Sequence, residues 1–232
     1  MSDSDPQKAT QVSSQEPNSS SASSAGRSTL WNLPNQLTIA RLILSVIFFV
    51  LLGLDLGPAT EARRQIILNV AFVVFILAVV TDFLDGYFAR RWGLISTFGR
   101  IADPFADKIV ICGGFVMLIS VSPLVQPWLA VVIIFREFLV SGLRSFLESK
   151  GVAFGAAFIG KLKMIVQSIT IPVLLFYEAN LRTPPAVSPS WLPNFFHYAT
   201  IAFLFLTLIL TVASCITYLQ RAYRLIRSEK RG

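Results

Sequence analysis

The sequence predicts an all-α integral membrane protein, with six transmembrane helices that follow a disordered N-terminal tail. Three observations support this fold class. Of the 232 residues, 54% are apolar and only 14% are charged, whereas a soluble domain carries about a quarter charged residues. Several apolar runs approach the length of about 20 residues that crosses a bilayer core. Lys and Arg gather on alternate connections between these runs, as the positive-inside rule describes for membrane proteins.

The N-terminal region predicts a cytoplasmic tail without regular structure. Residues 1–28 are rich in Ser, with Gln, Pro, Asp and Gly, and contain no apolar run that could form the core of a signal peptide. The sequence therefore predicts three parts: the tail at 1–28, a six-helix membrane domain at 29–226, and a short basic cytoplasmic C-terminus at 227–232.

The apolar runs define the six predicted spans. They cover residues 37–54, 65–88, 101–121, 125–147, 160–178 and 198–220. The connections contain Pro or Gly, which favour turns, as at Gly57-Pro58 and Ser122-Pro123. The Pro-rich stretch 183–193, together with the aromatic residues Trp191, Phe195 and Phe196, predicts an external loop that meets the membrane interface.

The distribution of basic residues predicts the orientation. An even number of spans places both termini on one side of the membrane. The basic residues expected on that side are Lys8, Arg27, Arg90, Arg91, Arg100, Arg144, Lys150, Lys161, Lys163, Arg221, Arg224, Arg227, Lys230 and Arg231. The opposite side has only Arg63, Arg64 and Arg182. The positive-inside rule therefore predicts cytoplasmic termini.

The overall charge and the cysteines exclude some classes of protein. The net charge is +7 and the pI is about 9.8, which in a soluble protein would suggest nucleic-acid binding. Here the basic residues flank membrane spans, so we expect anionic lipid rather than nucleic acid as the partner. Cys112 and Cys215 both lie inside apolar runs, and they provide neither a disulfide framework nor the spacing of a zinc site.

Four aspartates lie at the cytoplasmic ends of the second and third predicted spans. Asp82 and Asp85 are three residues apart, and Asp103 and Asp107 are four apart, so each pair projects from one face of a helix. If the two helices face each other, the four carboxylates meet at the membrane edge. Ionisable groups are costly there and usually functional, and four like charges need cations to share a site.

The residues around the aspartates favour a metal-dependent diphosphate site. Oxygen ligands suit Mg²⁺ or Mn²⁺, and His197 is expected on the opposite side, which argues against zinc. Gly86 and Ala89 leave room for a bulky ligand, and Arg90 can reach a phosphate. Two metal ions would neutralise a diphosphate and polarise the phosphorus under attack. Asp103 precedes Pro104, so taken alone it could be a helix cap.

The spacing of these residues resembles a known family signature. It reads Asp82-x2-Asp85-Gly86-x2-Ala89-Arg90-x8-Gly99-x3-Asp103-x3-Asp107, and it matches the signature of the CDP-alcohol phosphotransferases at every position. The resemblance implies a six-helix membrane enzyme, commonly a homodimer, that displaces CMP from a CDP-linked lipid or alcohol.

The resemblance also implies roles for individual residues. Asp82, Asp85 and Asp103 would bind metal, two ions per site as Mg²⁺ or Mn²⁺, and Asp107 would be both a ligand of the second ion and the general base. The residues that would bind the CDP-lipid are Asn35, Thr38, Gly86, Ala89, Arg90, Ser96 and Gly99.

Three further segments, 33–41, 136–144 and 160–167, resemble the bacterial branch of this family that makes phosphatidylglycerophosphate. This resemblance implies transfer of the phosphatidyl group of CDP-diacylglycerol to sn-glycerol 3-phosphate. CMP would be released, and the reaction would supply phosphatidylglycerol and cardiolipin synthesis. It also implies a multi-pass protein of the bacterial inner membrane with a cytoplasmic active site.

Basic residues of the fourth and fifth spans independently predict an anionic acceptor. Arg136, Val140 and Arg144 fall on one helical face, and Lys161 begins the fifth span. Arginine forks and lysine charges suit a phosphate, so we predict that Arg136, Arg144 and Lys161 bind the acceptor phosphate. Two alternatives stay open: Arg136 could pair with its neighbour Glu137, and the basic residues near the interface could simply extend toward it.

Three other functions are compatible with parts of the pattern. The same family includes enzymes whose acceptor is inositol phosphate, serine or phosphatidylglycerol. Intramembrane prenyltransferases also bind a lipid diphosphate through Asp-rich motifs, but those motifs lie far apart, whereas here all four aspartates fall within 26 residues. A divalent-cation transporter would need carboxylates near the midplane, and the external half offers only Asp55, Glu61 and Glu178.

Overall fold

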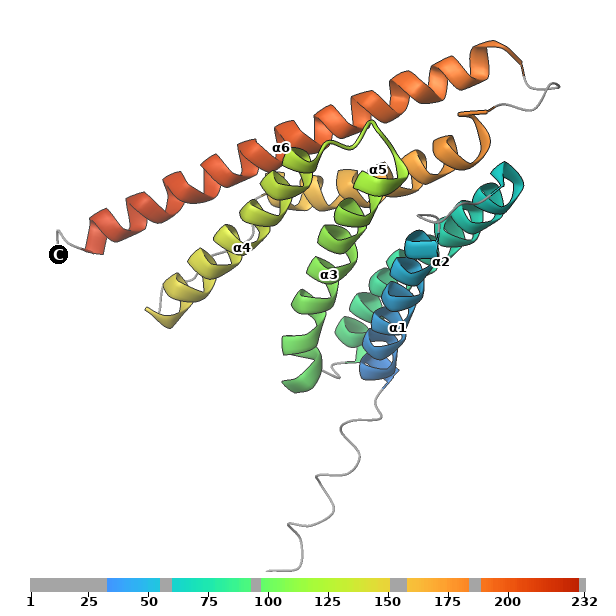
Figure 1. Ribbon diagram of the computed structural model, residues 1–232. Helices are drawn as coiled ribbons and strands as arrows, with labels where there is room; N and C mark the ends of the chain where they lie inside the picture. Colours follow the sequence, from blue (N-terminus) through green and yellow to red (C-terminus); the bar gives the residue numbers. More distant parts are fainter. Residues whose placement is uncertain (1–32, 55–59, 93–96, 151–157, 184–188, 230–232) are drawn as a thin grey trace, which may run out of the picture.

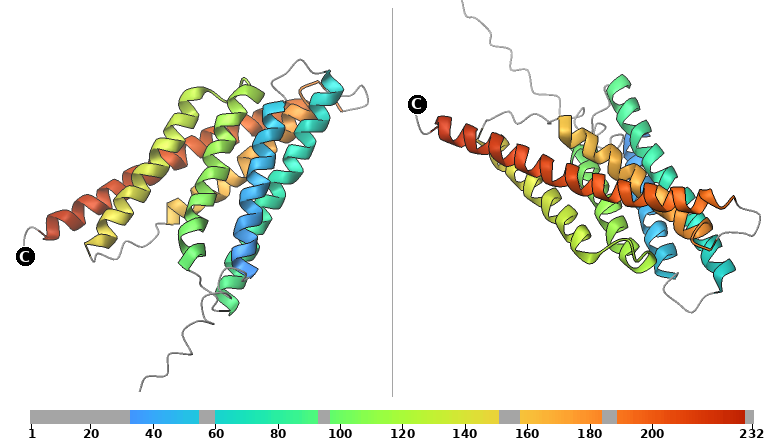
Figure 2. Two further views of the ribbon diagram at one scale, coloured as in Figure 1. Left: turned by 60° about the horizontal axis from the view of Figure 1, so that its bottom comes forward. Right: turned by 90° about the horizontal axis from the view of Figure 1, so that it is seen from above.

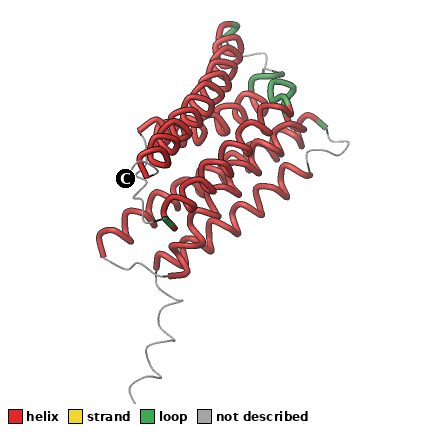
Figure 3. The backbone as a smooth tube through the Cα atoms, turned by 90° about the vertical axis from the view of Figure 1, so that its left-hand side faces the viewer, coloured by secondary structure: helices red, strands yellow, loops and turns green. Residues whose placement is uncertain are grey.

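The computed structural model describes residues 33–54, 60–92, 97–150, 158–183 and 189–229. Almost all of these residues are helical (Figures 1 and 3). The helices are α1 (Leu33–Leu54), α2 (Glu61–Trp92), α3 (Thr97–Val121), α4 (Pro127–Ser149), α5 (Phe158–Asn180) and α6 (Trp191–Glu229). The predicted tail at 1–28 lies outside the described residues.

The six helices confirm the predicted fold class. Within the described residues, α1, α2, α5 and α6 are long and apolar enough to cross a bilayer. Less than a third of each span is buried in the bundle for α1, α2 and α6, and half is buried for α5, so many apolar side chains face outward, as expected when the surrounding medium is lipid. The chain is therefore an all-helical membrane protein.

The second and third helices extend further than the sequence predicted. The prediction ended the second span at 88 and began the third at 101, with a connection at 89–100. In the structure α2 continues to Trp92 and α3 begins at Thr97. The apolar run sets where a helix enters the hydrocarbon, but Ala89, Arg90 and Arg91 are good helix formers, so α2 continues beyond that run.

The prediction of an external loop at 183–193 was wrong at its C-terminal end. The last helix, α6, begins at Trp191 and runs for 39 residues to Glu229, beyond the predicted limits of 198 and 220. Phe195 and Phe196 therefore lie on this helix. Pro193 does not prevent the early start, because the N–H groups of a first helical turn have no partners within the helix and proline is tolerated there.

The helices pack in a closed order that differs from their order in the chain. α1 contacts α2 and α3, α2 contacts α5, α5 contacts α6, α6 contacts α4, and α4 contacts α3. Figures 1 and 2 show α5 and the long α6 crossing obliquely over the group formed by α1, α2 and α3. This order brings α4, α5 and α6 together, which matters for the site described below.

An apolar core lies where the helices meet. The rings of Phe48 on α1 and Phe75 on α2 have centroids 5.3 Å apart. Gly113 of α3 lies against the ring of Phe49, and a Cβ at this position would collide with that ring. A small residue there lets α1 and α3 approach closely, as in other membrane bundles. Further core residues are Leu52, Leu68, Phe115, Leu118, Ile133, Ile171, Leu174 and Leu175.

A polar cluster centred on Glu178 of α5 ties the other end of the bundle together. Its carboxylate accepts hydrogen bonds from Ser122 Oγ at 2.6 Å, Arg182 Nη1 at 2.9 Å and Arg64 Nη2 at 3.4 Å. Arg64 also donates to the carbonyl of Val121 at 2.8 Å. The Glu178 side chain is only 1% exposed. These contacts therefore offset the free-energy cost of burying its negative charge. The cluster therefore joins α2, α5 and the segment after α3.

We expect Glu178→Ala to destabilise the fold. The change leaves the Ser122 hydroxyl and the two arginines without this carboxylate, and the loss of a hydrogen bond to a charged group costs about 1.5 to 3 kcal/mol. That corresponds to a melting temperature in detergent lower by about 3 to 12 °C. Glu148 of α4 is exposed, so Glu148→Ala is a matched control that should melt like the wild type. Equal melting of the two variants would contradict the proposed structural role of Glu178.

Candidate active site

The site is centred on Arg41 of α1, which connects two of the four predicted carboxylates. Arg41 Nη1 lies 2.7 Å from Asp82 Oδ1 on α2 and 2.7 Å from Asp107 Oδ1 on α3. The arginine side chain is 1% exposed, whereas the Asp82 and Asp107 side chains are 43% and 31% exposed. The guanidinium group thus lies at the buried inner end of the site, and the two carboxylates lie at its solvent-exposed side.

The packing of α1 explains how these carboxylates meet. The sequence analysis considered a direct meeting of the second and third helices, but in the structure α1 contacts both α2 and α3. Sequence reasoning gave Arg41 no role. The sequence did contain an indication that Arg41 is part of a site. It is the single charged residue in the predicted apolar span 37–54, and a charge inside a span usually has a specific partner.

The other two aspartates are described only by their position in the helices. Asp85 lies on α2 and Asp103 on α3, but their side chains lie outside the described part of the chain. Because α3 begins at Thr97, Asp103 and Pro104 lie within the helix and not at its start. The alternative that Asp103 is a helix cap is therefore wrong.

Of the residues predicted to bind the CDP-lipid, one has a described side chain. Thr38 lies on α1, three residues before Arg41, and is buried at 1% exposure. The side chains of Asn35, Gly86, Ala89, Arg90 and Gly99 lie outside the described part of these helices, and Ser96 lies outside the described residues altogether. The predicted roles of these seven residues stay predictions.

The described carboxylates fit the chemistry of a hard divalent cation. Asp82 and Asp107 each direct an oxygen at the same nitrogen of Arg41, so the two groups converge on one region. Carboxylate oxygens are the donors that Mg²⁺ and Mn²⁺ prefer. Among the described side chains, no group of three or more His, Cys, Asp or Glu residues is assembled. A complete ligand set would therefore need Asp85 and Asp103 as well.

A basic cavity of about 340 Å³ lies next to Asp107. Its lining includes all three residues predicted to bind the acceptor phosphate, Arg136 and Arg144 of α4 and Lys161 of α5. Asp107 also lines it. The helical spacing brought Arg136, Val140 and Arg144 to one face as predicted, and the contact of α5 and α6 adds Lys161 and Tyr218 to the same cavity.

Glu137 lies between two cations at the side of this cavity. Its Oε1 and Oε2 are each 3.3 Å from Arg136 Nη1, and Oε1 also pairs with the ammonium group of Lys163. Arg136 therefore pairs with its neighbour and lines the cavity at the same time, so the two interpretations of Arg136 do not exclude each other. Lys163, at 1% exposure, is buried with Glu137 and does not extend to the membrane interface.

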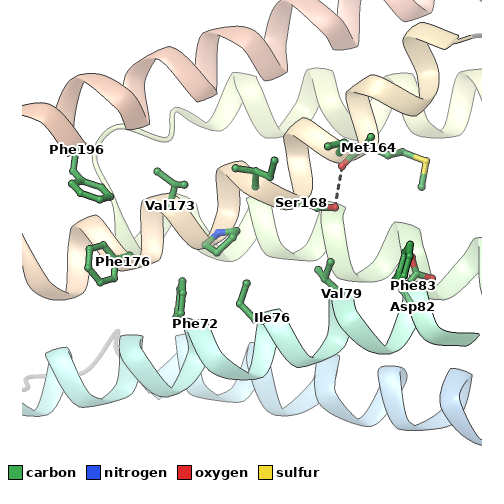
Figure 4. A pocket seen from close by; sticks show the side chains of 13 residues that line it. Phe72, Ile76, Val79, Asp82, Phe83, Met164, Ser168, Val173, Phe176 and Phe196 are labelled. Carbon is green, nitrogen blue, oxygen red and sulfur yellow. Dashed lines mark hydrogen bonds between the residues drawn. The ribbon is translucent and has the colours of Figure 1, made fainter.

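An apolar cavity of about 740 Å³ reaches the site from the other side. It is lined mainly by α2 and α5, with Phe196 from α6. Figure 4 shows Phe72, Phe176 and Phe196 toward one end, and Asp82 with Phe83 at the other. Among the described residues of the lining, Asp82 alone is charged. This cavity is therefore an apolar passage that ends at one of the carboxylates.

A small pocket of about 40 Å³ lies between the two larger cavities. Arg41, Asp82 and Asp107 line it, together with Met164 of α5. Asp82 also lines the apolar cavity, Asp107 also lines the basic cavity, and Met164 lines all three. An apolar passage, a pair of carboxylates and a basic pocket thus follow one another along the bundle.

The order of these three cavities suits a reaction between a lipid diphosphate and an anionic alcohol. Comparison with known proteins supports the same kind of reaction. The sequence model of the family described as CDP-alcohol phosphatidyltransferase matches residues 31–219. The chain belongs to the CDP-alcohol phosphatidyltransferase family. The matched residues include all six helices apart from the last turns of α6, and they contain every residue of the site described above.

Curated members of the CDP-alcohol phosphatidyltransferase family resemble the chain over much of its length. The CDP-diacylglycerol–glycerol-3-phosphate 3-phosphatidyltransferase of Bacillus subtilis is 34% identical over 177 residues, which are 72% of this chain and 90% of the relative. The protein of the same name from Mycoplasma pneumoniae is 36% identical over 62% of this chain and 67% of its own. The probable phosphatidylglycerophosphate synthase of Mycobacterium tuberculosis is 32% identical over 86% of each chain.

Family membership decides between the classes that the sequence left open. It confirms the resemblance drawn from the aspartate signature. It does not support an intramembrane prenyltransferase or a cation transporter. What it does not decide by itself is the acceptor alcohol, because the family description names the CDP-linked donor and no acceptor.

Proposed function

We propose that this chain transfers the phosphatidyl group of CDP-diacylglycerol to sn-glycerol 3-phosphate, which gives phosphatidylglycerophosphate and CMP. Curated relatives from several bacteria carry the name of this activity, at 34 to 37% identity. The observation that carries the proposal is the order of the three cavities, in which Asp82 and Asp107 lie between an apolar passage and a basic pocket.

The apolar cavity supports a lipid donor that enters from the bilayer. Its volume of about 740 Å³ falls in the range of ligand sites, and its lining of aromatic and aliphatic side chains suits acyl chains. Asp82 at its end would place the diphosphate of the donor beside the carboxylates. A reaction with a lipid substrate can therefore proceed at the membrane edge without removing the acyl chains from an apolar environment.

The carboxylates support a role for two divalent ions, Mg²⁺ or Mn²⁺. We propose that Asp82, Asp85, Asp103 and Asp107 hold them. When bound, such ions neutralise a diphosphate and polarise the phosphorus under attack. Arg41 holds Asp82 and Asp107 toward each other, and it supplies a buried positive charge that limits the repulsion between them.

Asp107 is in a position to act on the acceptor. It lines both the small pocket with Asp82 and the basic cavity. We propose that it accepts the proton of the 1-hydroxyl group of glycerol 3-phosphate while that oxygen bonds to the lipid-bearing phosphorus. The bond from this phosphorus to the oxygen of CMP breaks, and CMP leaves with the electron pair. Arg136, Arg144 and Lys161 would hold the acceptor phosphate during this step.

The same arrangement supports an orientation in the membrane. Asp107, which meets Asp82 at Arg41, lines a cavity with Arg144 and Lys161, whereas Arg64, near the other end of α2, shares the Glu178 carboxylate with Arg182. By the positive-inside rule we propose that the active site and both termini are cytoplasmic, in the bacterial inner membrane. We also propose a homodimer, as the family resemblance implies.

The acceptor is tested by comparing alcohols in one preparation. Membranes that contain the chain are supplied with CDP-diacylglycerol and, in turn, with glycerol 3-phosphate, inositol phosphate, serine or phosphatidylglycerol, and CMP release is measured. We expect glycerol 3-phosphate to give the fastest release. Unphosphorylated glycerol should be a very poor acceptor, because the basic groups would then have no phosphate to pair with. Faster release with any of the other three acceptors would overturn the assignment.

A substitution in the basic cavity tests the proposed phosphate site. We expect Arg136→Gln to raise KM for glycerol 3-phosphate by about 10- to 150-fold, because a charge-assisted hydrogen bond contributes about 1.5 to 3 kcal/mol. KM for CDP-diacylglycerol should change little, because Arg136 does not line the apolar cavity. Steady-state kinetics with each substrate varied separately provide the measurement. An unchanged KM for glycerol 3-phosphate would place the phosphate elsewhere.

A further inference from the structure

The basic cavity is completed by α6, a helix to which sequence reasoning assigned no site residue. Ser214 and Tyr218 lie four residues apart and therefore on one face of this helix. Ser214 contacts Arg136 of α4, and Tyr218 contacts both Arg136 and Arg144. We infer that Ser214 and Tyr218 are positioning residues that fix Arg136 and Arg144 for the acceptor phosphate, an inference that rests on the acceptor site proposed above.

Ser214 holds Arg136 with a defined hydrogen-bond polarity. Its hydroxyl donates to the carbonyl of Thr211 at 2.9 Å, so its oxygen can accept the bond from Arg136 Nε, also at 2.9 Å. Ser214 is fully buried, at 0% exposure, and does not line the cavity. It can therefore influence a bound acceptor only through Arg136.

Two hydrogen-bonding partners hold the guanidinium group of Arg136, and they use two of its three nitrogens. Nε is bound by Ser214, and Nη1 is bound by Glu137. Within the described part of the chain, no protein partner of Nη2 is present, while the residue lines the basic cavity. Because the guanidinium group is planar and rigid, fixing one edge fixes the direction of the remaining donors. Ser214 and Glu137 thus fix the plane of the guanidinium group at the cavity that Arg136 lines.

Tyr218 contacts both arginines at once. Its ring centroid lies 5.7 Å from Arg136 Cζ, within the range of a cation–π interaction, and its hydroxyl accepts a long hydrogen bond from Arg144 Nη2 at 3.5 Å. Tyr218 is only 2% exposed, although it lines the cavity. A Cβ on Gly160 of α5 would lie 3.0 Å from the tyrosine oxygen, so the small residue makes room for this hydroxyl.

The inference predicts a change in one Michaelis constant. Removing a hydrogen bond that orients another group has a modest effect, so we expect Ser214→Ala to raise KM for glycerol 3-phosphate by about 3- to 10-fold. KM for CDP-diacylglycerol and kcat should stay within about twofold of the wild type. Tyr218→Phe keeps the ring and removes the long bond from Arg144, so a smaller increase in the same constant is expected. Ser214→Thr keeps the hydroxyl and should restore the wild-type KM.

A matched control separates positioning from general loss of structure. The hydroxyl of Thr217, also on α6, donates to the Ala213 carbonyl of its own helix, so Thr217→Val should leave all three constants unchanged. In the Arg136→Gln background, Ser214→Ala should add little, because both changes act through the same guanidinium group. The inference would be overturned if Ser214→Ala raised both Michaelis constants in parallel or lowered kcat alone. It would also be overturned if Ser214→Ala raised KM for glycerol 3-phosphate as much in the Arg136→Gln background as in the wild type.

The result also distinguishes this inference from the proposed function. If Arg136→Gln raises KM for glycerol 3-phosphate and Ser214→Ala does not, the acceptor site stands and the positioning role fails. If Arg136→Gln itself leaves that KM unchanged, the proposed acceptor site fails, and the positioning role fails with it.

Discussion

Replacing Asp82 by Asn is expected to lower the rate of CMP release by more than about 100-fold, by analogy with other perturbed metal sites. The amide keeps the shape of the side chain but removes the charge, so a bound cation would lose a ligand and Arg41 would lose the ion pair with Asp82. The measurement is CMP release from membranes in the presence of added Mg²⁺ or Mn²⁺. Activity of the wild type should also disappear in excess chelator and return when either ion is restored.

An exposed carboxylate provides the control for this substitution. Glu148→Gln makes the same chemical change on the surface of α4, outside every cavity of the site, and should leave activity unaltered. Near-normal turnover of the Asp82→Asn protein, or full activity in excess chelator, would contradict the assignment of Asp82 as a metal ligand.

Asp107→Asn is expected to separate binding from turnover. If Asp107 takes the proton of the acceptor hydroxyl, its loss should lower kcat by about 10² to 10⁴, the usual contribution of a general base. Binding of CDP-diacylglycerol should fall much less, because Arg90 and the ions held by the other three aspartates would still bind the diphosphate. Calorimetric titration of the variant with CDP-diacylglycerol, beside its steady-state kinetics, provides both values.

The contrast between the two aspartates follows from their positions. Asp82 lies at the end of the apolar cavity, and Asp107 lines the basic one. If Asp107→Asn lost binding of CDP-diacylglycerol in proportion to turnover, Asp107 would be a ligand alone, and the proton would need another acceptor.

The parts of the fold that depend on hydrophobicity could be predicted from the sequence. The spans at 37–54, 125–147 and 160–178 agree with α1, α4 and α5 to within a few residues, because their apolar runs end near turn-forming residues. The ends of α2 and α6 could not be predicted in this way. Both helices continue into charged sequence, where hydrophobicity no longer reports on helix formation.

The parts of the candidate site that could be predicted are those formed by charged residues at a helical spacing. The spacing of Arg136 and Arg144 placed both on one helical face, and the structure brings them into one cavity with Lys161 and Asp107. The pairing of Lys163 with Glu137 and the contacts of Ser214 and Tyr218 could not be predicted. They depend on how α4, α5 and α6 pack, and a serine or tyrosine inside a span has no charge that requires a partner.

The closed order of the helices has a consequence for how the enzyme matures during synthesis. Arg41, Asp82 and Asp107 all lie on α1 to α3, so this half of the site can assemble once the first three helices have left the ribosome. The acceptor half also needs Ser214 and Tyr218 of α6, the last helix to be made. Because chains fold from the N-terminus as they emerge, the nascent protein acquires its carboxylates before it acquires a complete pocket for the alcohol.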